Sequence, residues 1–234
     1  MLDVFYISYN ESFADENYEL LKVFAPHAQR VHGVKGIFEA HKAAAQKAKT
    51  SHFYVVDADA VIEEEFQFKF VPDQLTDAYP GVPETNCVFT YRSRNPVNDL
   101  IYGYGAVKLF PRAPFLELND WSVDMTTSIG CPFVPKFQIS NVTAFNTDPF
   151  NTWKSAFGEC VKLSSNIIDN NDNIDDEYRL KVWQTRGMKR PYGEYAILGA
   201  EQGGEFGKTY QNDKSALKMI NDFEWLERKF EEAI

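Results

Sequence analysis

The chain has 234 residues, of which 44% are hydrophobic and 15% aromatic, so it can bury the core of one compact domain. Its net charge of −10 argues against a protein that coats nucleic acid over its whole surface, because a like-charged surface repels phosphate. Residues 1–10 carry neither a basic leader nor a cleavable apolar segment, and no apolar run reaches the ~18 residues of a membrane span, so we expect a cytoplasmic protein without a membrane partner.

The first sixty residues alternate between short apolar runs and stretches with helical spacing. The pattern predicts strands at residues 4–8, 31–34 and 53–56 and helices at residues 16–24 and 35–49. The order strand, helix, strand, helix, strand predicts an α/β fold with a parallel, doubly wound sheet. In such sheets, ligands bind beyond the carboxyl ends of the strands.

The remainder of the chain gives fewer signals. Prolines and mixed polarity predict a loop over residues 66–83, and polar, acidic residues predict another over 170–176. Further strands are expected at 88–91 and 105–110, and helices from Pro149 onwards and over 213–230. The segment GAEQGGEFG at 199–207 lacks the lysine and serine of a phosphate loop, so we expect its small residues to allow close helix packing.

The run DADAVI at residues 57–62 carries the clearest chemistry. Asp57 and Asp59 directly follow an apolar strand, and residues two apart on an extended strand point the same way. Two carboxylates at a ligand-binding edge suit Mg²⁺ or Mn²⁺ shared with substrate phosphates. A pair of solvated aspartates in a loop is the simpler alternative for this motif.

In these aspartates and the strand before them, the chain resembles glycosyltransferases of the GT-A type. DADAVI corresponds to their DxD motif, and GIFEAHKAAAQKAK at 36–49 to the helix that packs beside the nucleotide. Two further segments, NPVNDLIYGYGAVKLFPR at 95–112 and SNVTAFNTDPFNTWKSAFGECVKL at 140–163, resemble phage-encoded members of this fold. The resemblance implies a Rossmann-like, mostly parallel sheet flanked by helices. It also implies a single domain over 1–234, with a nucleotide-sugar-binding half at 1–112 and an acceptor-binding half with C-terminal helices at 113–234.

The same resemblance implies transfer of a sugar from a nucleotide sugar, typically a UDP-sugar, to an acceptor hydroxyl with the help of Mn²⁺ or Mg²⁺. Asp59 would be a metal ligand, and Asp57 would contact the metal or the ribose. The nucleotide-sugar pocket would further include Ser8, Tyr9, Asn10, Lys35, His41 and Ala58. A packed histidine on an apolar helix face is an equally good interpretation of His41.

Inverting transfer also requires a general base near the acceptor hydroxyl. Asp148, at the start of a predicted helix, matches the position that an acid often has in this fold, although it also fits a simple N-cap. Asp124 is the second candidate. Many members have a C-terminal histidine as a third metal ligand, but all four histidines of this chain precede Asp57.

The acceptor is the least constrained feature. Resemblance to phage proteins implies a 5-hydroxymethylpyrimidine in double-stranded DNA, and a cell-surface glycan or a protein is the alternative. Candidate sugar or acceptor contacts are Tyr102, Gly103, Gly105, Arg186, Lys189 and Arg190, the last three flanked by Trp183 and Tyr192 for base stacking.

The DADAVI run is also compatible with other functions. In a haloacid-dehalogenase-like phosphatase, Asp57 would be a nucleophile and Asp59 an acid/base, although that motif normally follows the first strand of its domain. Binding of a sugar or nucleotide without turnover is a further alternative, since a DxD motif alone does not establish catalysis.

Overall fold

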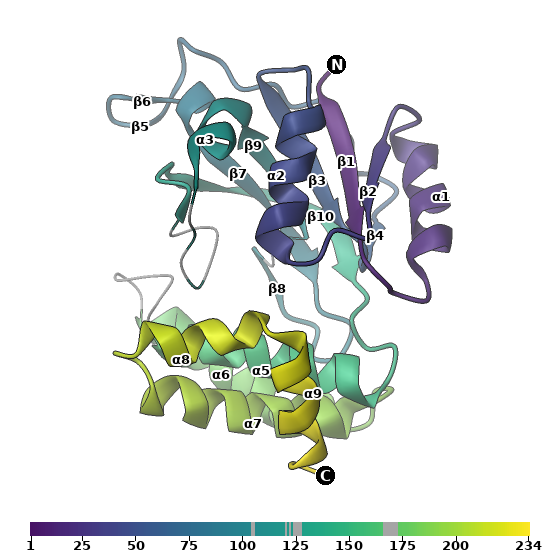
Figure 1. Cartoon of the computed structure of the whole chain (residues 1–234), viewed down its shortest axis with the longest axis vertical. Coiled ribbons are helices and arrows are strands. Elements are labelled where there is room, and N and C mark those ends of the chain that lie inside the picture. The colour runs from purple at the N-terminus through teal and green to yellow at the C-terminus, as the bar shows by residue number, and fades with distance from the viewer. Residues whose placement is uncertain (104–105, 120, 122, 124–127, 166–172) are drawn as a thin grey trace. The chain divides into compact units, whose positions relative to one another are not determined.

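The computed structural model describes residues 1–103, 106–119, 121, 123, 128–165 and 173–234, and the chain divides into two compact units (Figure 1). The sheet unit comprises Met1–Arg94, Ile101–Trp121 and Ser128–Ala144, and the helical unit comprises Asn95–Leu100, Ser122–Thr127 and Phe145–Ile234. The main division therefore follows Ala144, farther along the chain than the expected division at 112/113. Among the described residues, no helix combines the length and apolar character needed to cross a membrane.

The sheet unit is built on one mixed sheet. Its strands lie in the order β2, β1, β3, β9, β7, β10, β4, with β8 beside β7. Their bounds are β1 Asp3–Ser8, β2 Gln29–His32, β3 His52–Asp57, β4 Ala60–Ile62, β7 Val88–Arg94, β8 Ile101–Tyr102, β9 Val107–Pro111 and β10 Phe133–Thr143. The expected strands at 4–8, 31–34, 53–56, 88–91 and 105–110 correspond to β1, β2, β3, β7 and β9 to within a few residues.

The sheet is parallel only in part. β1 pairs in parallel with β2 and β3, and β7 with β10, whereas β9 runs antiparallel to both β3 and β7, and β4 runs antiparallel to β10. The α/β class is therefore confirmed, but a mostly parallel sheet is not confirmed. After β3, a tight turn at Ala58 and Asp59 leads directly into β4 in place of a crossover helix, and β4 pairs with β10.

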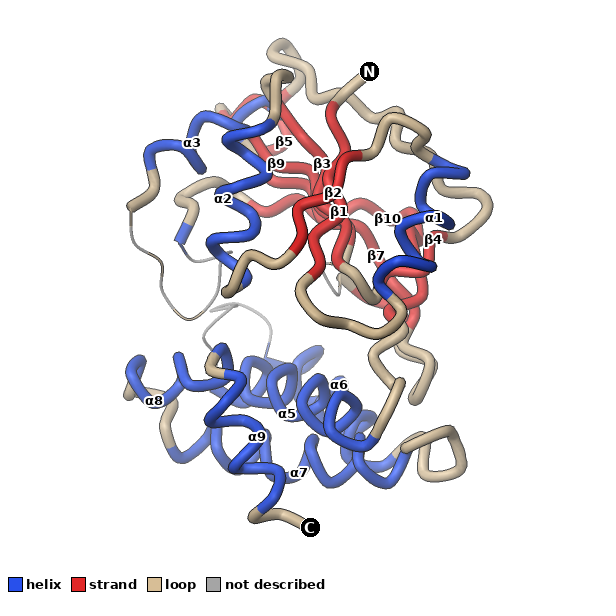
Figure 2. The backbone as a smooth tube through the Cα atoms, turned by 45° about the vertical axis from the view of Figure 1, so that its right-hand side comes forward, coloured by secondary structure: helices blue, strands red, loops and turns tan. Residues whose placement is uncertain are grey.

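Helices cover both faces of the sheet (Figure 2). They are α1 (Ala14–Phe24) on one face and α2 (Ile37–Lys47) with α3 (Arg112–Glu117) on the other. The apolar β3 supplies both cores, because successive side chains of a strand point to opposite faces. Tyr54 packs on the α1 side against Phe68, with ring centroids 5.2 Å apart, and Phe53 packs on the other side against Phe115 at 5.9 Å.

The segment between Trp121 and Pro149 contains a strand that the sequence pattern did not predict. β10 includes Pro135 and has register shifts between Lys136 and Asn141, so its apolar residues do not alternate regularly. Its buried end is polar and hydrogen-bonded, with Asn141 Nδ2 donating to Thr143 Oγ1 at 3.0 Å. The expected loop at 66–83 holds a short hairpin, β5 (Asp77–Tyr79) and β6 (Val82–Pro83), followed by η1 (Glu84–Asn86).

The helical unit is organised around a close helix pair. Its helices are α5 (Pro149–Ser165), α6 (Asn173–Thr185), α7 (Gly193–Thr209), α8 (Lys214–Lys218), η2 (Met219–Asn221) and α9 (Phe223–Glu231). Any Cβ added at Gly203 of α7 would meet the backbone of Phe157 in α5, and one at Gly207 would lie 2.6 Å from Val161 O. The prediction that the small residues of 199–207 allow close helix packing is therefore confirmed.

Three boundaries in this unit are informative. The helix predicted from Pro149 is confirmed as α5, whereas the single C-terminal helix expected over 213–230 is interrupted by Asp222, which caps α9 through Trp225 N at 3.1 Å. The loop expected at 170–176 is wrong in its second half, because α6 begins at Asn173. Acidic side chains in the first turn of a helix interact favourably with the helix macrodipole and stabilise the helix, so an acidic stretch does not by itself indicate a loop.

Candidate functional site

The parallel strands β1, β2 and β3 place three polar side chains at one end of the sheet. Ser8 ends β1 and is in register with His32 at the end of β2. Asp57 ends β3 and is in register with Ile7. The carboxyl ends of these strands therefore form the edge at which α/β sheets bind ligands.

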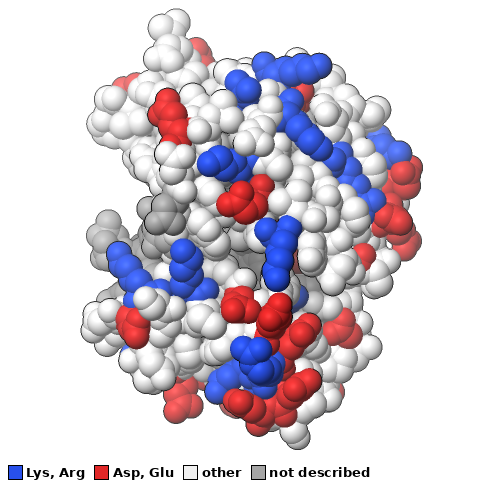
Figure 3. Space-filling view, in the orientation of Figure 1, with Lys and Arg blue, Asp and Glu red and all other residues white. Residues whose placement is uncertain are grey.

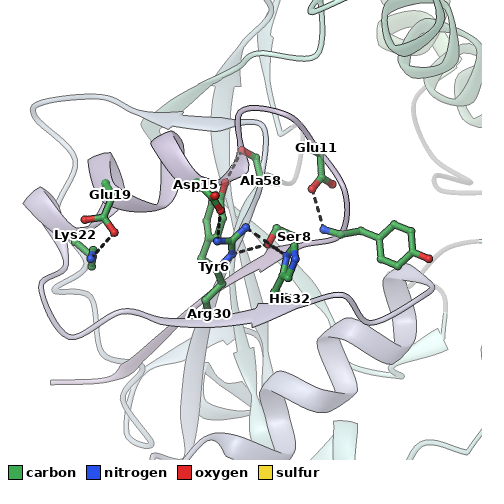
Figure 4. Close-up of polar contacts among 10 residues, drawn as sticks. Tyr6, Ser8, Glu11, Asp15, Glu19, Lys22, Arg30, His32 and Ala58 are labelled. Atoms are coloured by element: carbon green, nitrogen blue, oxygen red, sulfur yellow. Dashed lines mark hydrogen bonds and ion pairs between the residues drawn. The ribbon is translucent and has the colours of Figure 1, made fainter.

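Arg30 organises the polar groups on β1 and β2 (Figure 4). Its Nε donates to Ser8 Oγ at 2.8 Å, and its Nη1 pairs with Asp15 Oδ1 at 2.5 Å. Ser8 Oγ lies 2.9 Å from His32 Nδ1, and Arg30 Nη2 lies 3.3 Å from the same nitrogen. Because arginine only donates, a consistent assignment has Ser8 donating to His32 Nδ1, with the histidine proton on Nε2.

These hydrogen bonds hold the Arg30 guanidinium in place at the strand edge. The Arg30 guanidinium lies 5.8 Å from the ring centroid of Tyr6 and 5.7 Å from that of Tyr18, within the range of a cation–π contact. The hydrogen bond and charge of Arg30 lower the pKa of Asp15 below its ordinary value. Sequence reasoning missed Arg30 and His32, although both alternate with the buried Val31 in β2.

Asp57 and Asp59 occupy different structural positions. Asp57 is the last residue of β3, and its backbone N donates to Ala106 O at 2.9 Å. Asp59 lies in the turn before β4, so the expectation that the two carboxylates point the same way from an extended strand does not hold. The structure instead places Asp57 at the end of the strand and Asp59 in the turn that directly follows it.

The surroundings of the two aspartates differ as well. Asp57 Oδ2 lies 3.8 Å from Lys108 Nζ, on the face covered by α2 and α3. The Tyr6 hydroxyl, on the opposite face, donates to Ala58 O at 3.0 Å. Burial raises the pKa of this hydroxyl, and the negative charges of Glu11, Asp59 and Asp15 raise it further, so Tyr6 stays a neutral donor under the turn.

A row of basic side chains continues from Asp57 across the same face. Thr90 of β7 is in register with Lys108 of β9, and Arg92 and Arg94 follow Thr90 at spacings of two, so they share its face. We call Lys108, Arg92 and Arg94 the cationic row. Arg94 Nε lies 3.7 Å from Glu63 Oε1, in the segment that follows β4. Lys108 is more than ten residues from Arg92 and Arg94 in the sequence, and the pairing of β7 with β9 places all three on one face of the sheet.

The cationic row ends at an exposed ring. Phe137, in the irregular part of β10, is 80% exposed, and the Arg92 guanidinium lies 4.8 Å from its ring centroid. Arg112, at the start of α3, instead donates to Ala45 O at 2.9 Å and holds α3 to α2. A ligand could therefore place a planar group on Phe137 and an anionic group on the neighbouring Arg92.

The remaining predicted nucleotide contacts divide into two groups. Tyr9 and Asn10 follow β1 as exposed residues, with Tyr9 N donating to Glu11 Oε2 at 2.8 Å, and Lys35 is exposed in the segment after β2. His41 is fully buried in α2, where Nδ1 bonds Ile37 O at 2.8 Å. Its ring meets Phe110 edge-on at 5.5 Å, so the structure places His41 in the core, away from the strand edge.

The structure describes the first two residues of the YGYG segment, Tyr102 and Gly103. Tyr102 is buried in β8 in register with Ser93. A Cβ added at Gly103 would lie 3.7 Å from Thr90 Oγ1, which is an ordinary contact, so the fold does not require glycine there. Gly105 lies outside the described residues.

Of the two general-base candidates, the structure describes Asp148. Asp148 caps α5, accepting from Asn151 N at 2.8 Å, Asn151 Nδ2 at 2.5 Å and Thr147 Oγ1 at 3.2 Å. Burial alone would raise the pKa of Asp148, but these hydrogen bonds lower it below its ordinary value. A low pKa and occupied oxygens favour the capping role over proton abstraction. Asp124 lies outside the described residues.

In the basic segment expected to contact the acceptor, the three cations are exposed, but one of the two flanking aromatic rings is buried. Arg186 and Lys189 are exposed between α6 and α7, and Arg190 Nη2 lies 3.1 Å from Asp99 Oδ2. Trp183 is fully buried, with its ring centroid 5.6 Å from that of Phe145, so it cannot stack on a base. Tyr192 is 37% exposed and is the flanking ring available for such a contact.

The oxygen ligands at the turn fit a divalent cation. Within the ranges that the structure describes, no three His, Cys, Asp or Glu side chains gather into a metal-binding group. Mg²⁺ is usually held by one or two carboxylates together with substrate phosphates and water, and the turn supplies two partly exposed carboxylates, Asp57 and Asp59. Such a pair would complete a cation site only together with oxygens from a ligand or from water.

Comparison with models of known protein families and with curated protein sequences finds no match to the chain.

Proposed function

We propose that the chain is a metal-dependent glycosyltransferase with a GT-A fold, which transfers a sugar from a nucleotide sugar to an acceptor hydroxyl. The observation that carries this proposal is the position of Asp57 and Asp59. Asp57 ends β3 and Asp59 lies in the turn that follows, beside the ends of two parallel strands, and Asp57 lies next to Lys108 of the cationic row. Carboxylates and cations together suit a diphosphate, whose charge requires both a bound cation and basic side chains.

The residues at the edge have distinct proposed roles. Asp57 and Asp59 would hold Mn²⁺ or Mg²⁺, which when bound neutralises charge on the departing nucleoside diphosphate. Lys108, with Arg92 and Arg94 beyond it, would bind phosphate oxygens. Ser8 and His32, fixed by Arg30, offer hydrogen bonds to a ribose or base.

The proposed reaction is a balanced group transfer. The acceptor oxygen forms a bond to the anomeric carbon of the donor sugar as the bond from that carbon to the diphosphate oxygen breaks. The bonding electron pair leaves with the nucleoside diphosphate, and the acceptor proton passes to a base or to water. The side chains of the strand edge bind and orient the donor, which lowers the entropic part of the barrier.

As the acceptor we propose a 5-hydroxymethylpyrimidine in DNA. The exposed Arg186 and Lys189, together with Tyr192, support this, because cations contact the DNA backbone and an exposed ring stacks on a base. The acidic chain would then contact DNA through a local basic segment only.

The test is sugar transfer with the purified protein. We expect Mn²⁺ and one of a panel of radiolabelled UDP-sugars to label hydroxymethylated DNA but not unmodified DNA. UDP release without DNA labelling would support the transferase and remove the DNA acceptor. No UDP release with any donor, in the presence of DNA, neutral glycans or water alone, would contradict the proposed function.

Phosphatase chemistry is a second candidate because of one contact. Lys108 Nζ lies 3.8 Å from Asp57 Oδ2, and a lysine beside an aspartate is suited to hold a phosphate against a carboxylate nucleophile. Release of inorganic phosphate from a phosphomonoester such as p-nitrophenyl phosphate, lost in Asp57→Asn, would favour this candidate over the transferase.

A further inference from the structure

A concave site lies entirely within the helical unit, between α7 and α9. The pocket has a volume of about 720 Å³, which is within the range of small-molecule clefts. α7 lines one side with Gln202 and Phe206, followed by Tyr210 directly after the helix, and α9 lines the other side, beginning at Trp225. α5 supplies the floor through Phe157, so the pocket arises because α7 and α9 both pack on α5.

Aromatic rings make up the apolar part of the pocket. The ring centroid of Phe206 lies 4.6 Å from that of Tyr210 and 5.5 Å from that of Trp225, and Trp225 lies 6.0 Å from Phe157. Phe157 is fully buried, whereas Tyr210 is 40% exposed. The row of rings thus runs from the core to the solvent, and Tyr210 forms its accessible end.

Charges of both signs surround these rings. Arg228 and Lys229 of α9 line the pocket together with Glu205 of α7 and Glu232 beyond α9, and Lys229 Nζ lies 3.6 Å from Glu232 Oε2. Figure 3 shows acidic and basic side chains side by side on the face of the helical unit where α9 lies. The two acids would repel an anionic ligand and the two bases a cationic one, so the balance favours a neutral ligand.

A fixed amide adds a hydrogen-bond donor. Trp153 Nε1 donates to Gln202 Oε1 at 2.7 Å, which sets the orientation of this side chain and leaves its NH₂ group to donate elsewhere. The pocket therefore has donors in Gln202 and Arg228 and acceptors in Glu205 and Glu232. A ligand with many groups that both donate and accept would satisfy them.

We propose that this pocket binds a neutral saccharide. A pyranose ring has a face of C–H groups, which packs on an aromatic ring, and a rim of hydroxyls, which both donate and accept. It carries no charge, in keeping with the balanced acids and bases of the rim. The proposal is independent of sugar transfer at Asp57 and Asp59, because all the lining residues belong to the helical unit.

Saturation-transfer NMR on the full chain tests the proposal without any nucleotide sugar present. The probes are the methyl glycosides of glucose, galactose, mannose and N-acetylglucosamine. We expect transfer to the ring C–H protons of at least one probe. Tyr210→Ala should raise the Kd of that probe by about fivefold or more, as expected for the loss of one aromatic contact, and Tyr210→Phe should leave the Kd unchanged.

The controls separate this site from the rest of the molecule. Tyr178→Ala removes a tyrosine of α6 that is 53% exposed and does not line the pocket, and Asp59→Asn alters the proposed metal site, so both should bind as the wild type does. Absence of transfer to every probe would overturn the proposal. Equal transfer with Tyr210→Ala, or stronger binding of the anionic indole-3-acetate in competition, would overturn it as well.

Discussion

Individual side chains near the strand edge show how context separates residues of one type. Asp57 and Asp59 are two positions apart, yet Asp57 lies beside Lys108, whereas the charge of Asp59 acts on the Tyr6 hydroxyl. The sequence identified both aspartates as candidates, but their orientation depends on a turn that the apolar pattern does not encode. Asp148, in the helical unit, is a third case, in which hydrogen bonds from Asn151 of its own helix lower the pKa of the carboxylate.

Asp148→Asn tests the capping role through its pH dependence. Asparagine also caps helices but does not titrate. It keeps one oxygen that accepts from Asn151 N, and it loses the charge and the Oδ2 acceptor of Asn151 Nδ2 and Thr147 Oγ1. The pKa of Asp148 is below its ordinary value of 3.8 in the folded chain, so its charge stabilises the fold above that pH and ceases to do so as the pH falls through the folded pKa. We expect urea unfolding to give a deficit of about 0.5–1 kcal/mol at pH 7 that shrinks below pH ~4. An equal deficit at pH 7 and pH 3 would contradict this assignment.

At the scale of elements, the sequence pattern was most informative where periodicity was strong. Up to β3, the strands β1 and β3 were predicted because they are apolar on both faces, and the helices between them because they are amphipathic. β10 was not predicted because its register shifts and the buried Ser140 and Asn141 disrupt the expected alternation. Arg30 and His32 were missed for a related reason, since β2 is short and mostly polar.

The glycines of α7 give a sharp test of helix packing. Gly203→Ala would place a methyl group against the backbone of Phe157, which cannot rotate away, so we expect a loss of about 1–3 kcal/mol in the free energy of unfolding. Gly158→Ala in α5 is the matched control, because a Cβ there meets nothing within 4 Å. It should raise stability by up to about 1 kcal/mol through helix propensity. Similar urea midpoints for the two variants would be inconsistent with the close α5–α7 contact.

At the scale of the whole molecule, chain order and structural units do not coincide. Asn95–Leu100 joins β7 to β8 of the sheet unit but belongs to the helical unit, where Val97 packs on Gly187. A Cβ at Gly187 would lie 2.6 Å from Val97 O, and the residue has a φ of +100°, which favours glycine. Contacts between segments so far apart in sequence leave no periodic signal, so the division into units could not be predicted from the pattern.

The central claim is that Asp57 and Asp59 bind a nucleotide sugar through a shared divalent cation. Calorimetric titration of UDP with and without Mn²⁺ tests it most directly, using the wild type, Asp59→Asn, and Glu64→Gln as an exposed, charge-matched control. We predict that Mn²⁺ strengthens UDP binding by about tenfold or more in the wild type and in Glu64→Gln, and that Asp59→Asn loses this effect while remaining folded. UDP binding that is equal with and without Mn²⁺, or unchanged in Asp59→Asn, would contradict the account.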